Sequence, residues 1–162
     1  MTDLIAEVRT HITEIGRLLF GRRLTDAAGG NISCRAGDLV CISPRYSGAK
    51  HHWDLKPENV LVCDLEGNKL EGDGDISREA AAHFRLLKDF PDGGAVIHAH
   101  PHNLMVFVMA RQPMLPVLEA TEKFGQIKVA NYAPSHNPRL AESLAEAFQG
   151  QEPAIRKQGA GV

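Results

Sequence analysis

Three histidines alternate with other residues in "AVIHAHPHN" (95–103), directly after a short apolar run. On a β-strand, residues two apart point to the same face, about 6–7 Å from each other along the chain. His98 and His100 would therefore present two imidazoles to one divalent ion, which binds such nitrogens at about 2.0–2.1 Å. The alternative is that one or both are hydrogen-bonded histidines of the core or its rim. Pro101 ends the strand, which makes His102 a weaker candidate.

A carboxylate comes shortly before this strand, in "SREAAAH" (77–83). A metal centre that performs chemistry needs a proton carrier beside it, and Glu79 could fill that role. Glu79 lies near the start of a helix predicted over residues 77–89, which leads directly into the histidine strand. The alternative is that Glu79 only stabilises the positive end of the helix dipole.

Two polar loops could contact a substrate. "AAGGNIS" (27–33) has adjacent glycines that let the backbone approach a ligand, and Asn31 and Ser33 supply polar side chains. "ISPRYSGAK" (42–50) follows a predicted strand. Either loop could instead be an ordinary turn or a solvated connection. The candidates for anion contacts in the second loop are Ser47, Gly48 and either Arg45 or Lys50.

Apolar periodicity and turn signals alternate helices with strands, which predicts one α/β domain. The final segment, "AIRKQGAGV" (154–162), is predicted to be a turn that enters a further strand. The predicted helices are 3–20, 77–89, 102–111 and 137–150, and the predicted strands are 31–35, 39–43, 59–64, 95–100 and 127–132.

Composition excludes several classes of protein. The 162 residues include 18 basic and 20 acidic side chains, for a net charge of −2 and no basic block. Binding to nucleic acid or to a membrane surface through bulk charge is therefore not expected. The start has no secretory pattern, and no apolar run approaches the roughly 20 residues of a membrane span. Three cysteines without a CxxC spacing predict reduced thiols, and the expected location is the cytoplasm.

Taken in order, "GGNIS", "ISPRYSG", "SREAAAH" and "FPDGGAVIHAHP" resemble the class II aldolase/adducin family over roughly residues 3–150. The resemblance implies a three-layer α/β/α fold with a central, mostly antiparallel mixed sheet. It implies a single domain over residues 1–162 that lacks its last strand and C-terminal helices. It also implies a homotetramer with active sites at the subunit interfaces.

For the site, the resemblance makes His98 and His100 two of three histidine ligands of a divalent ion, with Zn²⁺ the expected metal. Glu79 falls on the catalytic acid/base. The third histidine is expected a few residues after Val162, and the alternatives are that His136 or His102 replaces it. The pocket for the substrate phosphate falls on Gly30, Asn31, Ser47, Gly48 and Ser77.

Among the departures of the sequence from the aldolase pattern, two concern substrate binding and the catalytic residues. Arg78 stands where the aldolases carry a second serine, and "LPVLEATEKFG" (115–125) has no tyrosine where the fuculose-phosphate enzyme has a catalytic one. The expected reaction is reversible aldol cleavage of a small sugar phosphate through a metal-stabilised enediolate. The alternatives are a sugar-phosphate 4-epimerase or a dehydratase of the same family and, outside the enzymes, an adducin-like structural module.

Overall fold

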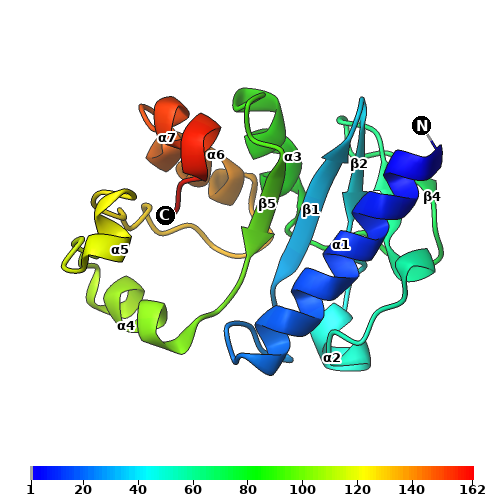
Figure 1. Ribbon diagram of the computed structural model, residues 1–162, viewed down its shortest axis with the longest axis horizontal. Helices are drawn as coiled ribbons and strands as arrows, with labels where there is room; N and C mark the ends of the chain where they lie inside the picture. The colour runs from blue at the N-terminus through cyan, green and yellow to red at the C-terminus, as the bar shows by residue number, and fades with distance from the viewer. Residues whose placement is uncertain (1) are drawn as a thin grey trace.

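The computed structural model describes residues 2–162, and its centre is a five-stranded sheet in the order β4-β3-β2-β1-β5. Every pairing between neighbouring strands is antiparallel. Helices cover both faces of this sheet (Figure 1), so the expected three-layer α/β/α architecture is confirmed. The strands are β1 (Asn31–Ala36), β2 (Leu39–Ile42), β3 (Leu61–Cys63), β4 (Lys69–Glu71) and β5 (Ala95–His98).

Helix α1 (Thr2–Gly21) covers one face of the sheet. Its apolar side buries Val8 and Ile12 against residues of β1, β2 and β3 and against Trp53. Trp53 is fully buried, and its indole lies so close to α1 that a Cβ at Gly16 would be 2.6 Å from the ring. The indole Nε1 donates a hydrogen bond to the carbonyl of Asp26, at 3.3 Å. Trp53 therefore ties the loop before β1 to the core.

Helix α3 (Ala80–Asp89) covers the opposite face, where Phe84 and Leu87 pack on β2 and β3. On this face β1 presents polar residues instead of apolar ones. Alternate residues of β1 reach the segment around α3: Asn31 contacts Ser77, Ser33 contacts His83, and the guanidinium of Arg35 donates to the carbonyl of Leu87. Because strand side chains alternate between faces, one strand supplies both the α1 core and this polar row.

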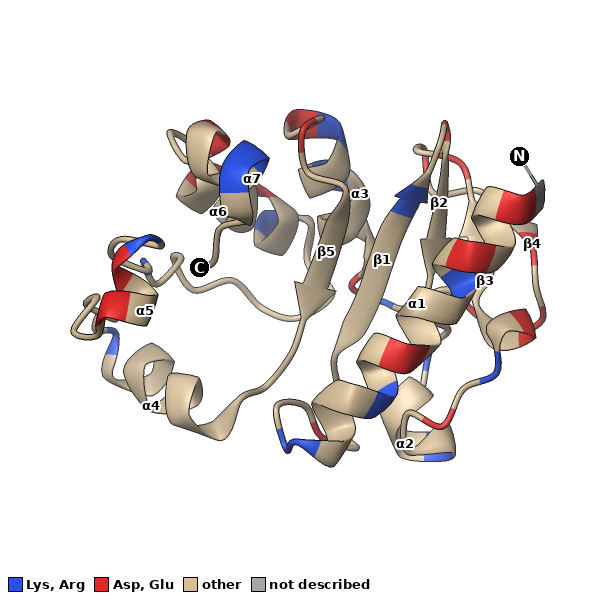
Figure 2. Cartoon of the chain, viewed as in Figure 1, with Lys and Arg blue, Asp and Glu red and all other residues tan. Residues whose placement is uncertain are grey.

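The second half of the chain extends beyond β5 (Figure 1). Helix α6 (Pro138–Phe148) packs against α3 through an apolar cluster of Leu86, Phe90 and Ala145, with the Phe90 and Phe148 rings 6.0 Å apart. Charged residues of both signs are spread over the molecule, and α4 (His102–Ala110) carries none (Figure 2). No helix within residues 2–162 is long and apolar enough to cross a membrane. The remaining helices are α2 (Ser47–His51), the short 3₁₀ helix η1 (Pro57–Asn59), α4 (His102–Ala110), α5 (Glu119–Glu122), α6 (Pro138–Phe148) and α7 (Glu152–Gln158).

Two predicted strands are wrong. Residues 127–132 form no strand, and Ile127 makes only an isolated bridge to Met114, because no neighbouring strand runs beside this segment. The segment from Ala154 to Gln158 is helical, as part of α7, instead of a turn that enters a strand. Pro153 in the first turn and two basic residues in the last turn are both favourable for a short helix.

Two further expectations need correction. The histidine strand is shorter than predicted and forms the edge of the sheet, with Ala95 exposed and 52% of Ile97 accessible. Helix α3 begins at Ala80 and not at residue 77, and no side chain caps it. The hydroxyl of Ser77 accepts the backbone N–H of Glu79 at 3.4 Å, so Ser77 lies in a turn before the helix.

Candidate active site

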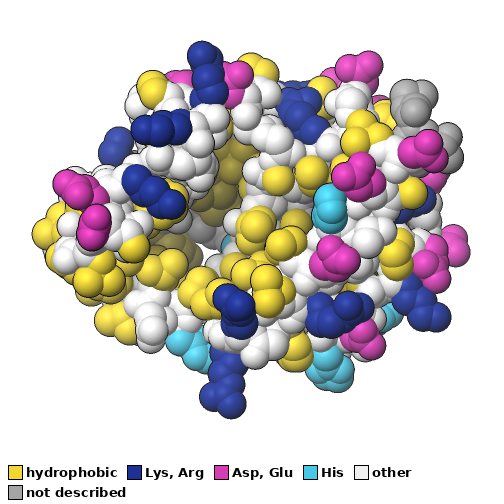
Figure 3. Space-filling view, viewed as in Figure 1, with side chains coloured by type: hydrophobic (Ala, Val, Ile, Leu, Met, Phe, Trp, Pro, Cys, Tyr) yellow, Lys and Arg dark blue, Asp and Glu magenta, His cyan; other side chains and the backbone are white. Residues whose placement is uncertain are grey.

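A cavity of about 1000 Å³ lies between the end of β5, the loop before β1, the turn before α3 and the C-terminal helices. The surface is visibly hollowed there (Figure 3). Among the residues of its wall are Gly30, Asn31, Ser77, Glu79, His98 and His100. The structure therefore brings six of the eight predicted site residues to one cavity, from three segments that are far apart in the sequence.

The register of the sheet explains how His98 reaches this cavity. His98 pairs directly with Asn31 across the β1–β5 ladder. Residues that face each other in an antiparallel pair point to the same side of the sheet, so His98 faces α3 together with Asn31. His100 lies two residues beyond, past the end of β5, and its ring contacts that of His98 with centroids 5.0 Å apart.

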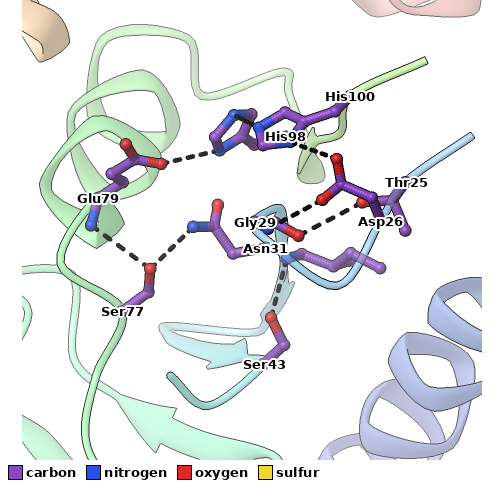
Figure 4. A network of polar contacts seen from close by, with 10 residues as sticks. Thr25, Asp26, Gly29, Asn31, Ser43, Ser77, Glu79, His98 and His100 are labelled. Carbon is purple, nitrogen blue, oxygen red and sulfur yellow. Dashed lines mark hydrogen bonds and ion pairs between the residues drawn. The ribbon is translucent and has the colours of Figure 1, made fainter. Parts of the chain in front are cut away.

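The two imidazoles converge through their Nε2 atoms, which are 3.2 Å apart (Figure 4). Each Nδ1 contacts a carboxylate: Nδ1 of His98 is 3.0 Å from Oε2 of Glu79, and Nδ1 of His100 is 3.3 Å from Oδ2 of Asp26. When each Nδ1–H donates to its carboxylate, both Nε2 atoms carry bare lone pairs that face each other. Such an arrangement requires a cation between them, either a proton or a metal ion.

The donor set fits a divalent metal. Two nitrogens bound tetrahedrally to one ion at about 2.0–2.1 Å lie about 3.3–3.4 Å apart, close to the observed separation. Metal-ligating histidines characteristically donate their other ring N–H to a carboxylate, and here each Nδ1 lies within 3.3 Å of a carboxylate oxygen. Burial lowers the pKa of His98; Glu79 and Asp26 oppose this effect, and His100 adds to it. His98 is therefore neutral at pH 7 and free to bind a metal.

A third ligand is not in place. Within residues 2–162 no group of three His, Cys, Asp or Glu side chains is arranged to hold a metal ion. His136 lines the same cavity, with its backbone in the left-handed region at φ 64°. His102 is exposed at the first residue of α4, away from the cavity wall. Of the two alternatives, only His136 shares the cavity.

Asn31 and Ser77 form a polar corner of the cavity. The amide of Asn31 donates to the hydroxyl of Ser77 at 2.8 Å, while Oδ1 of Asn31 is buried without a partner among the described residues. A buried acceptor without a donor is costly, so a ligand hydroxyl would stabilise it. Gly30 beside it has φ 90°, and a Cβ there would lie 2.6 Å from the Thr25 hydroxyl, so only glycine fits.

Ser47 and Gly48 do not reach the cavity. Both are buried, and the hydroxyl of Ser47 donates to the carbonyl of Pro44 at 2.6 Å. Gly48 packs against the loop before β1, where a Cβ would lie 2.6 Å from the carbonyl of Asp26. From this loop Arg45 and Tyr46 line the cavity instead, and Nε of Arg45 is buried without a partner within the described residues.

His83 is a fully buried histidine in the cavity wall, one helical turn after Glu79. Its Nδ1 is 2.7 Å from the hydroxyl of Ser33, and its Nε2 has no partner among the described residues. Burial, with a smaller contribution from the nearby His98, lowers the pKa of His83 from 6.5 to about 3. His83 is thus neutral throughout the physiological range.

Acidification should destabilise the protein through His83. Between its folded pKa of about 3 and the unfolded value of 6.5, only the unfolded state binds the proton, so stability falls as pH falls. From pH 7 to pH 5 this group alone accounts for a loss of about 2 kcal/mol. Urea unfolding of metal-free wild type and His83→Gln at both pH values measures it. Equal pH dependence in the two proteins would contradict the assignment.

The sequence analysis did not identify Asp26 as a site residue, and it left Arg45 and Lys50 as alternatives. A local signal for Asp26 is present in "TDAAGG" (25–30), where small residues and glycines follow the aspartate. Such a segment is typical of an Asx turn, in which the aspartate side chain accepts a backbone N–H two residues later. Its contact with His100, however, depends on how the loop meets the end of β5. No local pattern specifies that meeting.

Residues 10–162 match the family described as "Class II Aldolase and Adducin N-terminal domain". An L-fuculose phosphate aldolase of Methanococcus maripaludis is 28% identical over 141 residues, which cover 86% of this chain and 76% of that protein. A methylthioribulose-1-phosphate dehydratase of Pseudomonas savastanoi pv. phaseolicola is 36% identical over 100 residues, 62% of this chain and 48% of that protein. This chain thus spans about half the length of the dehydratase.

The fold comparison agrees. The solved structure of an L-fuculose 1-phosphate aldolase superimposes with a TM-score of 0.79 and 29% identity, covering 89% of this chain and 68% of that one. Aldolases, dehydratases and decarboxylases all occur among the named relatives. The family generally depends on a divalent metal ion and is consistent with phosphorylated sugar substrates. The chain belongs to the class II aldolase and adducin N-terminal domain family.

Proposed function

We propose that the chain is a divalent-metal-dependent lyase that cleaves a small sugar phosphate by a reversible aldol reaction. The observation that carries the proposal is the convergence of Nε2 of His98 and Nε2 of His100 beside the carboxylate of Glu79. His98 and His100 would hold the ion, with zinc the first choice for a site of imidazole nitrogens. The bound ion would stabilise negative charge that develops on the substrate oxygens.

The protein side chains divide the remaining work. Glu79 carries the proton at the substrate carbon beside the carbonyl, since it is the only carboxylate among the predicted site residues and its side chain is 19% exposed at the cavity wall. Gly30, Asn31 and Ser77 bind the phosphate or a neighbouring hydroxyl, and the Arg45 guanidinium adds positive charge to the same cavity. Ser47 and Gly48 support this pocket indirectly, because the Ser47 hydroxyl bonds within its own loop and Gly48 packs against the loop before β1.

Dehydration of a sugar phosphate is a second candidate. The dehydratase relative is more identical to this chain than the aldolase relative, although over fewer residues. In addition, residues 115–125 offer no tyrosine. The same acid/base carboxylate could remove a proton beside the carbonyl in either reaction, and the fate of the leaving group would differ.

A panel of phosphorylated pentuloses and deoxyhexuloses, incubated with the zinc-loaded protein and followed by NMR, tests the proposal. Aldol cleavage releases an aldehyde and a three-carbon or two-carbon phosphate fragment. Dehydration releases water and leaves the carbon chain intact, while epimerisation gives an isomer. If a metal-loaded, folded protein turns over none of them, the proposed lyase activity is wrong and the adducin-like structural module becomes the leading explanation.

We further propose that the protein self-associates as a homotetramer in the cytoplasm. Helix α4 is apolar and yet has no buried residue, and its exposed residues include Val106 and Met109, 64% and 83% accessible. Apolar side chains gather on this side of the molecule (Figure 3). A helix that is apolar all round is normally covered. Light scattering after size exclusion should give four times the monomer mass, and a monomer would contradict the proposal.

The proposed cytoplasmic location is supported by the cysteines, since the three free thiols fit a reducing compartment.

A further inference from the structure

Asp26 occupies an unusual position at the candidate metal centre, because it is anchored at three places. Oδ1 accepts the backbone N–H groups of Ala28 and Gly29, at 2.8 and 3.0 Å. Its carbonyl accepts the indole N–H of Trp53. Oδ2 is left to face Nδ1 of His100 (Figure 4). The carboxylate is thus held in one orientation before any ligand arrives.

The loop that carries Asp26 also fixes the plane of the His100 ring. A Cβ at Gly29 would lie 2.4 Å from Cε1 of His100, so the imidazole rests directly on the glycine backbone. Oδ1 of Asp26 already accepts two backbone N–H groups, and Oδ2 lies 3.3 Å from Nδ1 of His100. An acceptor oxygen in that position favours the tautomer of His100 with hydrogen on Nδ1.

We propose that Asp26 is a positioning residue that fixes His100 in the tautomer with hydrogen on Nδ1 and so directs its Nε2 lone pair toward the metal. The role of Asp26 toward a metal rests on the proposed function, whereas the contact of Asp26 with His100 is independent of that function. A carboxylate behind a metal-bound imidazole also makes the nitrogen a stronger donor, and loss of such a partner typically costs about 10–100-fold in metal affinity. Asp26 then does for His100 what Glu79 does for His98, without any part in proton transfer.

Asp26→Asn separates this role from the support of the loop. Asparagine keeps a carbonyl oxygen for the N–H groups of Ala28 and Gly29, so the loop is retained. The oxygen that faces His100 is replaced by an NH₂ group, which cannot accept the Nδ1 hydrogen and favours hydrogen on Nε2 instead. Asp26→Ala loses both functions and should also lower the melting temperature. Asp38→Asn is the matched control, since Asp38 is exposed in the turn between β1 and β2.

Two measurements test the inference. Nitrogen-15 NMR of the metal-free protein at pH 8.5, where imidazoles are neutral, reports the tautomer of His100 directly. We expect Nδ1–H in wild type and in Asp38→Asn, and a shift toward Nε2–H in Asp26→Asn. Competition with a chromophoric chelator reports Zn²⁺ affinity, which we expect to fall by about 10–100-fold in Asp26→Asn with an unchanged melting temperature of the metal-free protein.

The outcomes separate the two proposals. If wild type binds no zinc, the proposed function is wrong, and the NMR result still decides whether Asp26 sets the tautomer. If wild type binds zinc and Asp26→Asn binds it equally well with the same tautomer, the inference about Asp26 alone is wrong. If Asp26→Asn fails to fold, the tautomer of His100 in wild type decides, because hydrogen on Nε2 there would overturn the inference.

Discussion

Replacing Glu79 with Gln is expected to lower kcat by about 10²–10⁴-fold, the usual contribution of a general acid/base. Glutamine has the shape of glutamate and can still accept a hydrogen bond from Nδ1 of His98, 3.0 Å from Oε2 in the wild type. It cannot accept and return a proton at neutral pH. The substrate that the panel identifies provides the kinetic assay, and elemental analysis should show unchanged metal content.

Glu66→Gln is the matched control for this variant. Glu66 is an exposed carboxylate that pairs with Lys88 at 3.2 Å, on the surface and away from the cavity wall. Its substitution should leave kcat and metal content at wild-type values. Retained turnover in Glu79→Gln would remove Glu79 from proton transfer and leave it only the role of orienting His98. A joint loss of metal and turnover would show that Glu79 acts mainly through the metal centre.

The double variant His98→Ala/His100→Ala is expected to reduce bound metal from close to one ion per chain to background. The two rings supply the only converging nitrogen pair within the described residues, and their Nε2 atoms are 3.2 Å apart. Without them Glu79 and Asp26 remain as separate carboxylates on opposite sides of the site. Turnover should disappear together with the metal, because charge that develops on the substrate would lose its stabilisation.

His11→Ala/His51→Ala provides the control, since both histidines are exposed and lie outside the cavity wall. This variant should keep its metal. Circular dichroism and thermal melting of both double variants establish that they are folded. Equal metal content in wild type and His98→Ala/His100→Ala would mean that the ion binds elsewhere. In the wild type, the 3.2 Å contact between the two Nε2 atoms would then be a hydrogen bond between the rings and not part of a metal site.

The sequence by itself determined the family and most of the helices and strands. The apolar periodicity of residues 3–20 and 137–150 predicted α1 and α6. In an amphipathic helix the residues of the buried face recur every three to four positions, so the pattern is visible in the local sequence. The alternation at His98 and His100 likewise predicted neighbouring imidazoles. Glu79 was predicted from its position near the start of the helix that precedes the histidine strand. Each of these features is local, or depends on elements adjacent in the chain, so the residue order carries it.

Only the tertiary structure decided which loop residues face the cavity. Ser47 and Gly48 were as suitable by type as Arg45, yet both are buried at the start of α2, where Gly48 packs against the loop that holds Asp26. Asp26 reaches His100 across 74 positions of sequence, and His83 is buried because β1 places Ser33 beneath it. The strand predicted over residues 127–132 failed for the same reason. A strand exists only where a neighbour completes its hydrogen bonds, and neither a pairing nor a long-range contact is written in the local sequence.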